Sequence, residues 1–284
     1  MTNNTLVYCR IEHLRTLELS GSDQATRFLQ SQVTGQVTTL LPNQGIASLL
    51  CNRRGQVVTD LYIQRHETSW RITLPNHFTD QVAKKWRPLL QLSNISHSEI
   101  TETTTVYLLS GPINGSIALN PSSRDQWHIC ITDTDQLPEA IQQAQYLEQS
   151  LSEAKIQLKL PSMTLSNSEK MLPQQLGYVS QGYVDFKKGC YLGQEVIARV
   201  EFKSNKKFYP ILLEIPEAYS DQLCKLLCGQ QVVGQIVYTH SGAKSVLGLG
   251  YLTTTNIDMQ TITLAGHDQP LNLIEYSVST EGKE

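Results

Sequence analysis

The chain has 284 residues, which is enough for one large domain or for two to three small ones, each with a proper core. Hydrophobic residues make up 40% of the chain and charged residues 17%, a composition typical of globular proteins rather than of disordered or fibrous ones. The net charge of −3 argues against binding nucleic acid through the overall field of the protein. We therefore expect no direct nucleic-acid partner.

The first ten residues contain no basic region followed by an apolar run, so we expect no signal peptide. No stretch approaches the roughly 18 consecutive apolar residues of a membrane span, and we expect a cytoplasmic protein with no membrane partner. The six cysteines are scattered along a long chain, which argues against a disulfide scaffold. Cys224 and Cys228 lack a second Cys or His pair at a zinc spacing, so we expect two buried or half-buried thiols and no metal site.

In chain order, the first elements read as a mixture of strands and helices. Residues 11–20 alternate between apolar and polar, which predicts a strand, and a short helix is expected from Asp23 to about Gln32. Residues 45–74 predict a meander of three strands, with a turn at 52–55. Apolar residues at a spacing of three to four then predict a helix from Asn76 to about Leu90.

In the second half of the chain, a mixture of strands and a helix is followed, after residue 206, by strand-like runs alone. Strands are expected near 95–100, 105–110 and 127–132, and a second amphipathic helix from about Pro138 to Ala154. After residue 206, short strand-like runs at roughly even spacing predict a small all-β barrel or sandwich. This order of elements is typical of an α+β protein. We place a boundary near residues 204–205, which divides the chain into regions 1–205 and 206–284.

One cysteine, Cys190, lies in a segment whose residues favour a reactive thiol. Gly189 and Gly193 free the backbone on either side of Cys190, and Lys187 and Lys188 precede it. A short helical pattern follows, so that we expect the thiol just before a helix N-terminus and beside two lysines. Both features favour the thiolate. Such a cysteine acts as a nucleophile, a redox centre or a transient metal ligand, and the alternative is a structural cysteine that packs under the helix.

Residues 188–195, Lys-Gly-Cys-Tyr-x-Gly-Gln-Glu, resemble the signature of the YgfZ proteins, which are relatives of the T-protein aminomethyltransferase of glycine cleavage. Stretches 28–34, 171–174 and 247–251, together with Gly55, are also similar to that family. The resemblance implies a ring of ferredoxin-like α+β modules closed by a C-terminal β-barrel, with a central hole that binds tetrahydrofolate. The inner module is expected at about 21–100, and the outer module at about 1–20 plus 101–205.

The resemblance also implies a function. It predicts a tetrahydrofolate-binding factor, rather than a classical enzyme, that supports the assembly or repair of iron–sulfur proteins, including enzymes that modify tRNA. Cys190 is then the working thiol, which exchanges with a transient cluster or with a client protein. The residues expected to bind the folate are Gln157, Lys188, Gly189, Tyr191, Gly193, Gln194, Glu195 and Arg199. Glu195 and Arg199 are four residues apart, in the favourable acid-before-base order for a helix pair.

One stretch departs from the family pattern. Where folate binders of this superfamily carry a pterin-binding Glu and a nearby Gly, this chain has Gln157 and Lys159, although Pro161 is kept. A neutral amide both donates and accepts hydrogen bonds, but charge-assisted bonds are roughly twice as strong, so we expect weaker or altered folate binding.

Three further interpretations stay open at this point. A folate-dependent one-carbon transferase is the first alternative function, and a docking scaffold with a structural Cys190 is the second. The third concerns the basic cluster of Arg199, Lys203, Lys206 and Lys207, which either receives a polyglutamate tail or phosphate or, as we favour, is a solvated linker.

Overall fold

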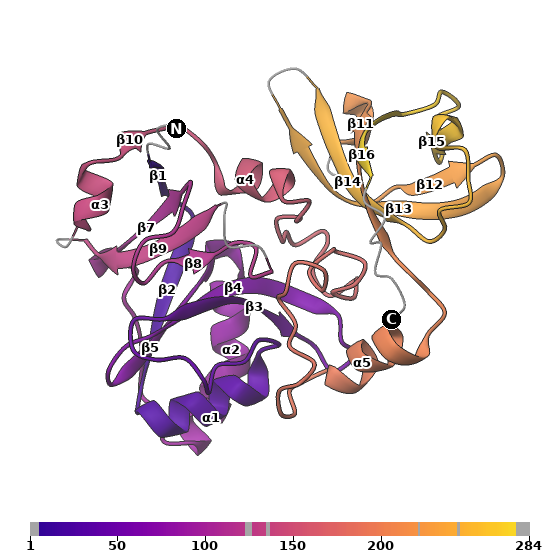
Figure 1. The fold of residues 1–284 in the computed structure, drawn as a ribbon. Helices are drawn as coiled ribbons and strands as arrows, with labels where there is room; N and C mark the ends of the chain where they lie inside the picture. Colours follow the sequence, from indigo (N-terminus) through magenta and orange to yellow (C-terminus); the bar gives the residue numbers. More distant parts are fainter. Residues whose placement is uncertain (1–5, 123–126, 135–136, 221, 243–244, 277–284) are drawn as a thin grey trace, which may run out of the picture.

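The protein folds as a mixed α+β structure with three β-sheets. The computed structural model describes residues 6–122, 127–134, 137–220, 222–242 and 245–276, and the sheets lie within these ranges (Figure 1). The prediction of an α+β protein is confirmed. Both ends of the chain, residues 1–5 and 277–284, fall in the predicted regions but outside the described residues.

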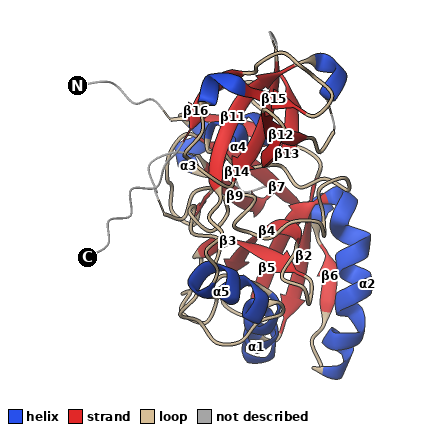
Figure 2. Ribbon diagram, turned by 90° about the vertical axis from the view of Figure 1, so that its right-hand side faces the viewer, coloured by secondary structure: helices blue, strands red, loops and turns tan. Residues whose placement is uncertain are grey.

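The first sheet carries the helices that position the candidate site. Its strand order is β3-β4-β5-β2-β6, and its neighbouring strands are antiparallel. The strands are β2 (Leu14–Ser20), β3 (Gly45–Cys51), β4 (Val57–Arg65), β5 (Ser69–Pro75) and β6 (His97–Glu99). Helices α1 (Ser22–Gln32) and α2 (Asn76–Leu92) pack against β5, as the periodicity predicts. Figure 2 shows both helices beside this sheet. The buried stripe of α2 ends at Leu90, whereas Leu89 beside it is 37% exposed.

The second sheet has the order β10-β1-β7-β9-β8, in which only the β1–β10 pairing is parallel among the described strands. Its strands are β1 (Val7–Ile11), β7 (Thr104–Leu109), β8 (Ile117–Ala118), β9 (His128–Asp133) and β10 (Gln145–Tyr146). The largest hydrophobic cluster joins this sheet to the first one and to residues 154–191.

The predicted helix from Pro138 to Ala154 is wrong. The segment instead forms α3 (Glu139–Gln142), strand β10 and helix α4 (Leu151–Gln157). The edge of β1 explains the interruption, because Gln145 and Leu147 donate backbone hydrogen bonds to Leu6 and Tyr8. A capping box then begins α4: the Ser150 hydroxyl accepts from the Glu153 N–H at 3.1 Å, and the Glu153 carboxylate accepts from the Ser150 N–H at 2.6 Å.

The third sheet contains the C-terminal strands and curls strongly (Figure 1). Its order is β15-β12-β13-β14-β11-β16. The strands are β11 (Tyr209–Ile215), β12 (Lys225–Cys228), β13 (Gln231–Ser241), β14 (Val246–Leu252), β15 (Ile262–Leu264) and β16 (Asn272–Tyr276), with short 3-10 turns at Glu217–Tyr219 and Met259–Thr261. The edges approach each other where the Leu271 N–H donates to the Ile262 carbonyl at 2.8 Å. This sheet encloses a hydrophobic cluster of its own.

Helix α5 (Gln194–Lys203) precedes this third sheet in the chain. It lies near α1, at the end of the molecule opposite to the third sheet (Figure 2). Among the described helices, none combines the length and the apolar character needed to cross a bilayer. A 3-10 turn at Thr101–Thr103 completes the described elements.

Candidate functional site

The Cys190 loop is fixed to the end of helix α1 by a buried lysine. Lys188 is 5% exposed, and its ammonium donates to the carbonyl oxygens of Gln30, Val33 and Gly35 at 2.8, 2.7 and 2.8 Å. These carbonyls lie at and just after the C-terminal end of α1, where helix carbonyls lack helical partners and a cation is favoured. All three N–H groups of the ammonium are therefore used inside the protein. Burial lowers the pKa of Lys188 to about 8, against a partial opposing effect of Asp185.

Backbone contacts fix the same loop along residues 30–35. The Asp185 N–H donates to Thr34 at 3.0 Å, and the Leu192 N–H donates to Ser31 at 3.2 Å. The Thr34 hydroxyl in turn donates to the Tyr183 carbonyl at 2.7 Å. Two stretches that resemble the YgfZ family, 28–34 and 188–195, thus contact each other although they are far apart in the sequence: Lys188 and Val33 are 155 residues apart.

On the other side of the thiol, Tyr191 and Gly193 complete the attachment. Tyr191 is buried in the main core, and burial raises the pKa of its hydroxyl, which forms no hydrogen bond with the described residues. Gly193 has φ 87° at the N-cap of α5, and a Cβ there would lie 2.5 Å from the Asn52 carbonyl oxygen and 2.9 Å from the Gly55 Cα. Only glycine permits this backbone approach to the β3–β4 turn.

Cys190 is exposed between these two attachments. All six cysteines lie in the described part of the chain. Cys9, Cys51 and Cys130 are buried, Cys224 and Cys228 are half-buried, and Cys190 alone is exposed. Strand β12 ends at Cys228, so this pair stands on and beside a strand. The described residues hold no group of three or more His, Cys, Asp or Glu side chains with metal-site geometry.

The remaining motif residues line the outside of the loop and of α5. A Cβ at Gly189 would meet nothing within 4 Å, and Gln194 is half-buried at the start of α5. Glu195 and Arg199 form the expected pair at 2.6 Å, with side chains 84% and 66% exposed. Helix α5 begins four residues after Cys190, at Gln194, rather than immediately after the thiol.

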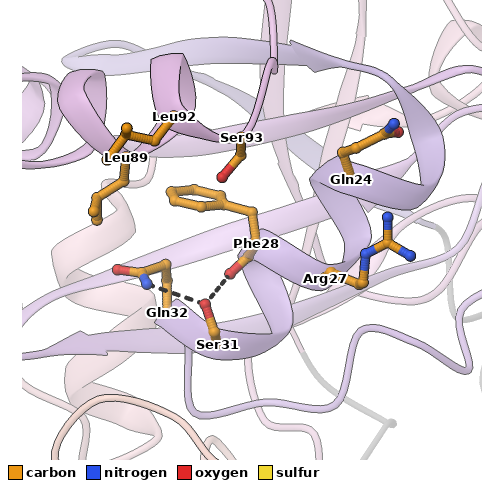
Figure 3. Close-up of a pocket in the computed structure, with 8 residues that line it drawn as sticks. All are labelled: Gln24, Arg27, Phe28, Ser31, Gln32, Leu89, Leu92 and Ser93. Carbon is orange, nitrogen blue, oxygen red and sulfur yellow. Dashed lines mark hydrogen bonds between the residues drawn. The ribbon is translucent and has the colours of Figure 1, made fainter.

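A groove opens between α1 and α2 next to this loop (Figure 3). It has a volume of about 510 Å³ and is lined by Gln24, Arg27, Phe28, Ser31, Gln32, Leu89, Leu92 and Ser93. Leu92 is 84% exposed, and the ring of Phe28 packs edge-on against Trp86 at 5.3 Å. The groove adjoins the Cys190 loop because Ser31, in its wall, accepts the hydrogen bond from Leu192.

The structure places Gln157 away from the Cys190 loop. Gln157 ends α4, which lies at the level of the C-terminal sheet, whereas α5 and the Cys190 loop lie beside α1 (Figure 1 and Figure 2). Its side chain is exposed, and its Oε1 accepts a hydrogen bond from the Trp127 indole N–H at 2.8 Å. The expected folate-binding residues are therefore divided between two places in the molecule.

Lys159, which replaces the family's glycine, adopts the backbone conformation that glycine prefers. Its φ is 56°, in the left-handed region that disfavours residues with a Cβ. Its ammonium forms an ion pair with Glu275 at 2.5 Å, and its side chain is 17% exposed. Lys159 thus combines a left-handed turn with a link to β16.

A buried polar cluster beneath α4 was not predicted. Lys155 pairs with Asp60, and the two side chains are 2% and 0% exposed. Asp60 also accepts a hydrogen bond from the Tyr62 hydroxyl at 3.2 Å, while Tyr178 and Tyr183 are fully buried nearby and carry hydroxyl pKa values raised by burial and by Asp60. The signal in the sequence is an aspartate within the apolar run of β4, since an acid buried there needs a partner.

The fold is similar to that of the glycine cleavage system aminomethyltransferase T from Bartonella henselae, with a TM-score of 0.64 and 12% sequence identity over 95% of this chain and 84% of that chain. No protein-family model matches the chain. The architecture is therefore that of the aminomethyltransferase T proteins.

Sequence relatives carry a different name. The chain is 23% identical over 239 residues to the tRNA-modifying protein YgfZ of Enterobacter sp. (strain 638), a match that covers 73% of each protein. It is 26% identical over 207 residues to the protein of that name in Photorhabdus laumondii, covering 64% of this chain and 63% of the relative. These homologues, together with the aminomethyltransferase fold, confirm the resemblance to YgfZ proteins that the Cys190 motif predicts.

Proposed function

We propose that the protein is a YgfZ-type factor that supports the assembly or repair of iron–sulfur proteins, among them tRNA-modifying enzymes, with Cys190 as the working thiol. The observation that carries the proposal is the exposed thiol on a loop that is fixed on both sides. Lys188 attaches one side to α1, and Tyr191 with Gly193 attaches the other to the core and to the β3–β4 turn. A thiol needed only for packing has no reason to stand outside.

The arrangement suits chemistry on another protein. A thiolate is the form that ligates iron or attacks a client's sulfur, and an exposed position allows a large partner to reach it. Because the loop is already ordered, little conformational entropy is lost when the thiol engages. The neighbouring groove between α1 and α2 leaves room for a partner beside the thiol.

Replacement of Cys190 in cells tests this proposal. In a strain that lacks its own YgfZ protein, we expect Cys190→Ala and Cys190→Ser to lose support of an iron–sulfur tRNA-modifying enzyme, measured as the modified nucleoside in bulk tRNA. The half-buried Cys224→Ala is the matched control and should retain support. Full support by the Cys190 variants would overturn the proposal and favour a docking scaffold.

Tetrahydrofolate is the second part of the proposal. Gln157 suits a pterin because its exposed amide, held beside the Trp127 indole, offers hydrogen bonds next to a flat aromatic surface. The Cys190 loop suits it less, since the Lys188 ammonium is already bonded to three carbonyls and Tyr191 is buried. We therefore assign the folate contact to the Gln157 side. Tetrahydrofolate carries one-carbon units when bound, and the protein's part is to hold its ring.

The folate contact is tested by titration calorimetry with tetrahydrofolate. Gln157→Glu should tighten binding by about tenfold, because it supplies a charged acceptor, and Gln157→Ala should weaken it. Tight binding that is unchanged in Gln157→Ala would contradict this assignment. Formation of methylene-tetrahydrofolate from an aminomethyl donor by the purified protein would instead favour a one-carbon transferase.

A further inference from the structure

The surface around Cys190 is built from four parts of the chain that contact one another. The Leu192 N–H of the Cys190 loop donates to the Ser31 carbonyl at 3.2 Å, in the wall of the groove between α1 and α2. On the other side of the loop, Gly193 packs against the β3–β4 turn. Helix α2 is joined to the same turn, because the Lys85 ammonium donates to the last carbonyl of β3 at 3.3 Å. The thiol, the turn and the groove are therefore neighbours on one surface.

Three exposed basic residues flank the thiol on this surface: Arg53 and Arg54 at the tip of the β3–β4 turn, and Lys187 shortly before the thiol. Their side chains form no ion pair with any described residue. The Asn52 side-chain oxygen accepts from the backbone N–H groups of Arg54 and Gln56 at 2.9 and 3.1 Å, which fixes the turn that carries both arginines. The three cations are therefore open to the charges of a partner.

The acids near this surface are largely offset by bases. Each of three acids has a base of its own segment beside it: Glu195 with Arg199 in an ion pair, Glu169 with Lys170 next in sequence, and Asp23 with Arg27 one turn later on α1. Asp185 is half-buried, and its carboxylate accepts from the Lys187 N–H at 2.7 Å. The turn and the loop therefore leave this surface with an excess of positive charge, although the whole chain has a net charge of −3.

The groove adds apolar side chains to this charged surface. Phe28, Leu89 and Leu92 line it from both helices, and the two leucines are 37% and 84% exposed (Figure 3). Leucines exposed side by side gain from burial against another apolar surface. A phosphate backbone offers no such surface, whereas a protein segment offers it together with charge. The combination of cations and apolar side chains therefore favours a protein partner over a nucleic acid.

We propose that this surface docks the client protein through an acidic segment of the client. Carboxylates of the client meet Arg53, Arg54 and Lys187, and apolar side chains of the same segment enter the groove between α1 and α2. Opposite charges steer the partners into contact and fix their register. Because thiolate ligands are anionic, the same cations favour a client's thiolate-held cluster beside Cys190. The inference deepens the proposed function, on which it rests, by stating the chemistry of the partner.

The probe is a purified, nuclease-treated iron–sulfur tRNA-modifying enzyme, and its binding to the full chain is measured by biolayer interferometry at about 50 mM and about 300 mM salt. Cys190→Ser is present in every protein, so that no covalent link forms. We expect binding that weakens at the higher salt. Arg53→Gln/Arg54→Gln should lose about fivefold to tenfold in affinity, mainly through slower association. The matched control, Arg10→Gln/Lys225→Gln, removes two exposed cations on the second and third sheets and should not change the affinity.

Leu92→Gln tests the apolar half of the surface. It should weaken binding of the enzyme by about tenfold, because the 84% exposed side chain is buried when the client docks. The matched control is Val232→Gln, at a side chain that is 50% exposed on the third sheet, and it should bind the enzyme unchanged. Equal losses in Leu92→Gln and Val232→Gln would contradict docking in the groove.

Three further results would overturn the proposal: absence of enzyme binding, an equal loss in the two charge variants, or tighter binding of bulk tRNA than of the enzyme, which would assign the surface to nucleic acid. Failure here is distinguishable from failure of the proposed function, because the binding assay is carried out without the thiol. If Cys190→Ala loses support of the enzyme in cells while Arg53→Gln/Arg54→Gln binds normally, the working thiol stands and the docking surface fails.

Discussion

Two lysines are buried in the described protein, and they are accommodated in opposite ways. Lys155 meets a carboxylate, Asp60, beneath α4, whereas Lys188 meets three backbone carbonyls at the end of α1. The first arrangement joins α4 to the first sheet through a charge pair. The second holds an exposed loop in place and leaves the neighbouring thiol open to solvent. The buried charge in the Cys190 loop thus fixes the backbone next to an exposed thiol, while the one under α4 links two parts of the core.

The largest loss of stability is expected when the fully buried pair of Lys155 and Asp60 is broken. Lys155→Met leaves the Asp60 carboxylate buried, with the Tyr62 hydroxyl as its one side-chain donor in the described part of the chain, so the free energy of unfolding should fall by about 3–5 kcal/mol. Urea unfolding measures the change. Arg199→Met breaks the exposed pair with Glu195 in the same manner and should cost less than about 1 kcal/mol. Similar losses of stability in Lys155→Met and Arg199→Met would contradict the larger contribution of the buried pair.

Lys188→Met should cost about 3 kcal/mol, because it leaves carbonyls at the end of α1 without their donor. Alkylation of Cys190 by iodoacetamide should also change in rate, since the loop loses its attachment. The exposed neighbour Lys187→Met is the control, and it should stay within about 0.5 kcal/mol of the wild type. An unchanged alkylation rate in a folded Lys188→Met protein would show that this lysine does not position the thiol.

The same lysine predicts a pH dependence. The pKa of Lys188 is lowered to about 8 in the folded protein, below the ordinary value of 10.5, so between these values the unfolded chain binds more protons. Stability contributed by this site must therefore rise as the pH increases from about 8 toward about 10.5. The difference in unfolding free energy between wild type and Lys188→Met should widen over that window. A constant difference from about pH 7 to about pH 10 would contradict a lowered pKa for Lys188 in the folded protein.

Two glycine substitutions, at Gly189 and Gly193, test the backbone on the two sides of Cys190. Gly193→Ala combines a left-handed φ with contacts of 2.5 and 2.9 Å to the β3–β4 turn, and should destabilise the protein by about 2 kcal/mol or more. Gly189→Ala meets open space and should cost under about 1 kcal/mol. Thermal unfolding measures both losses of stability. A larger loss in Gly189→Ala than in Gly193→Ala would contradict the close approach at Gly193.

The smallest effect concerns the turn after α4. Lys159→Gly and Lys159→Ala both remove the ion pair with Glu275, so their difference isolates the left-handed backbone at φ 56°. The glycine variant should be the more stable of the two by about 1 kcal/mol, measured by urea unfolding. Equal stability would mean that this conformation carries no strain.

Periodicity and motif spacing found most of the regular structure and the exposed thiol. The helices α1 and α2 and the C-terminal strands follow apolar patterns that local sequence records. The predicted helix at 138–154 is interrupted because part of this segment pairs with the distant edge of β1, which no local pattern reveals. Likewise, the sequence predicts Lys188 as a folate-binding residue, and only the fold shows that its ammonium bonds carbonyls of residues 30–35. The Trp127 partner of Gln157 came from tertiary contact as well.

The most direct test of Cys190 as the working thiol is a repair assay with purified components. An iron–sulfur tRNA-modifying enzyme with an oxidatively damaged cluster is incubated with the protein, ferrous iron, sulfide, a thiol reductant and tetrahydrofolate, and its recovered activity is measured. We predict that the wild type raises the recovery above the level reached without the protein, and that folded Cys190→Ser does not. Equal recovery with wild type and Cys190→Ser would contradict a functional role for this thiol.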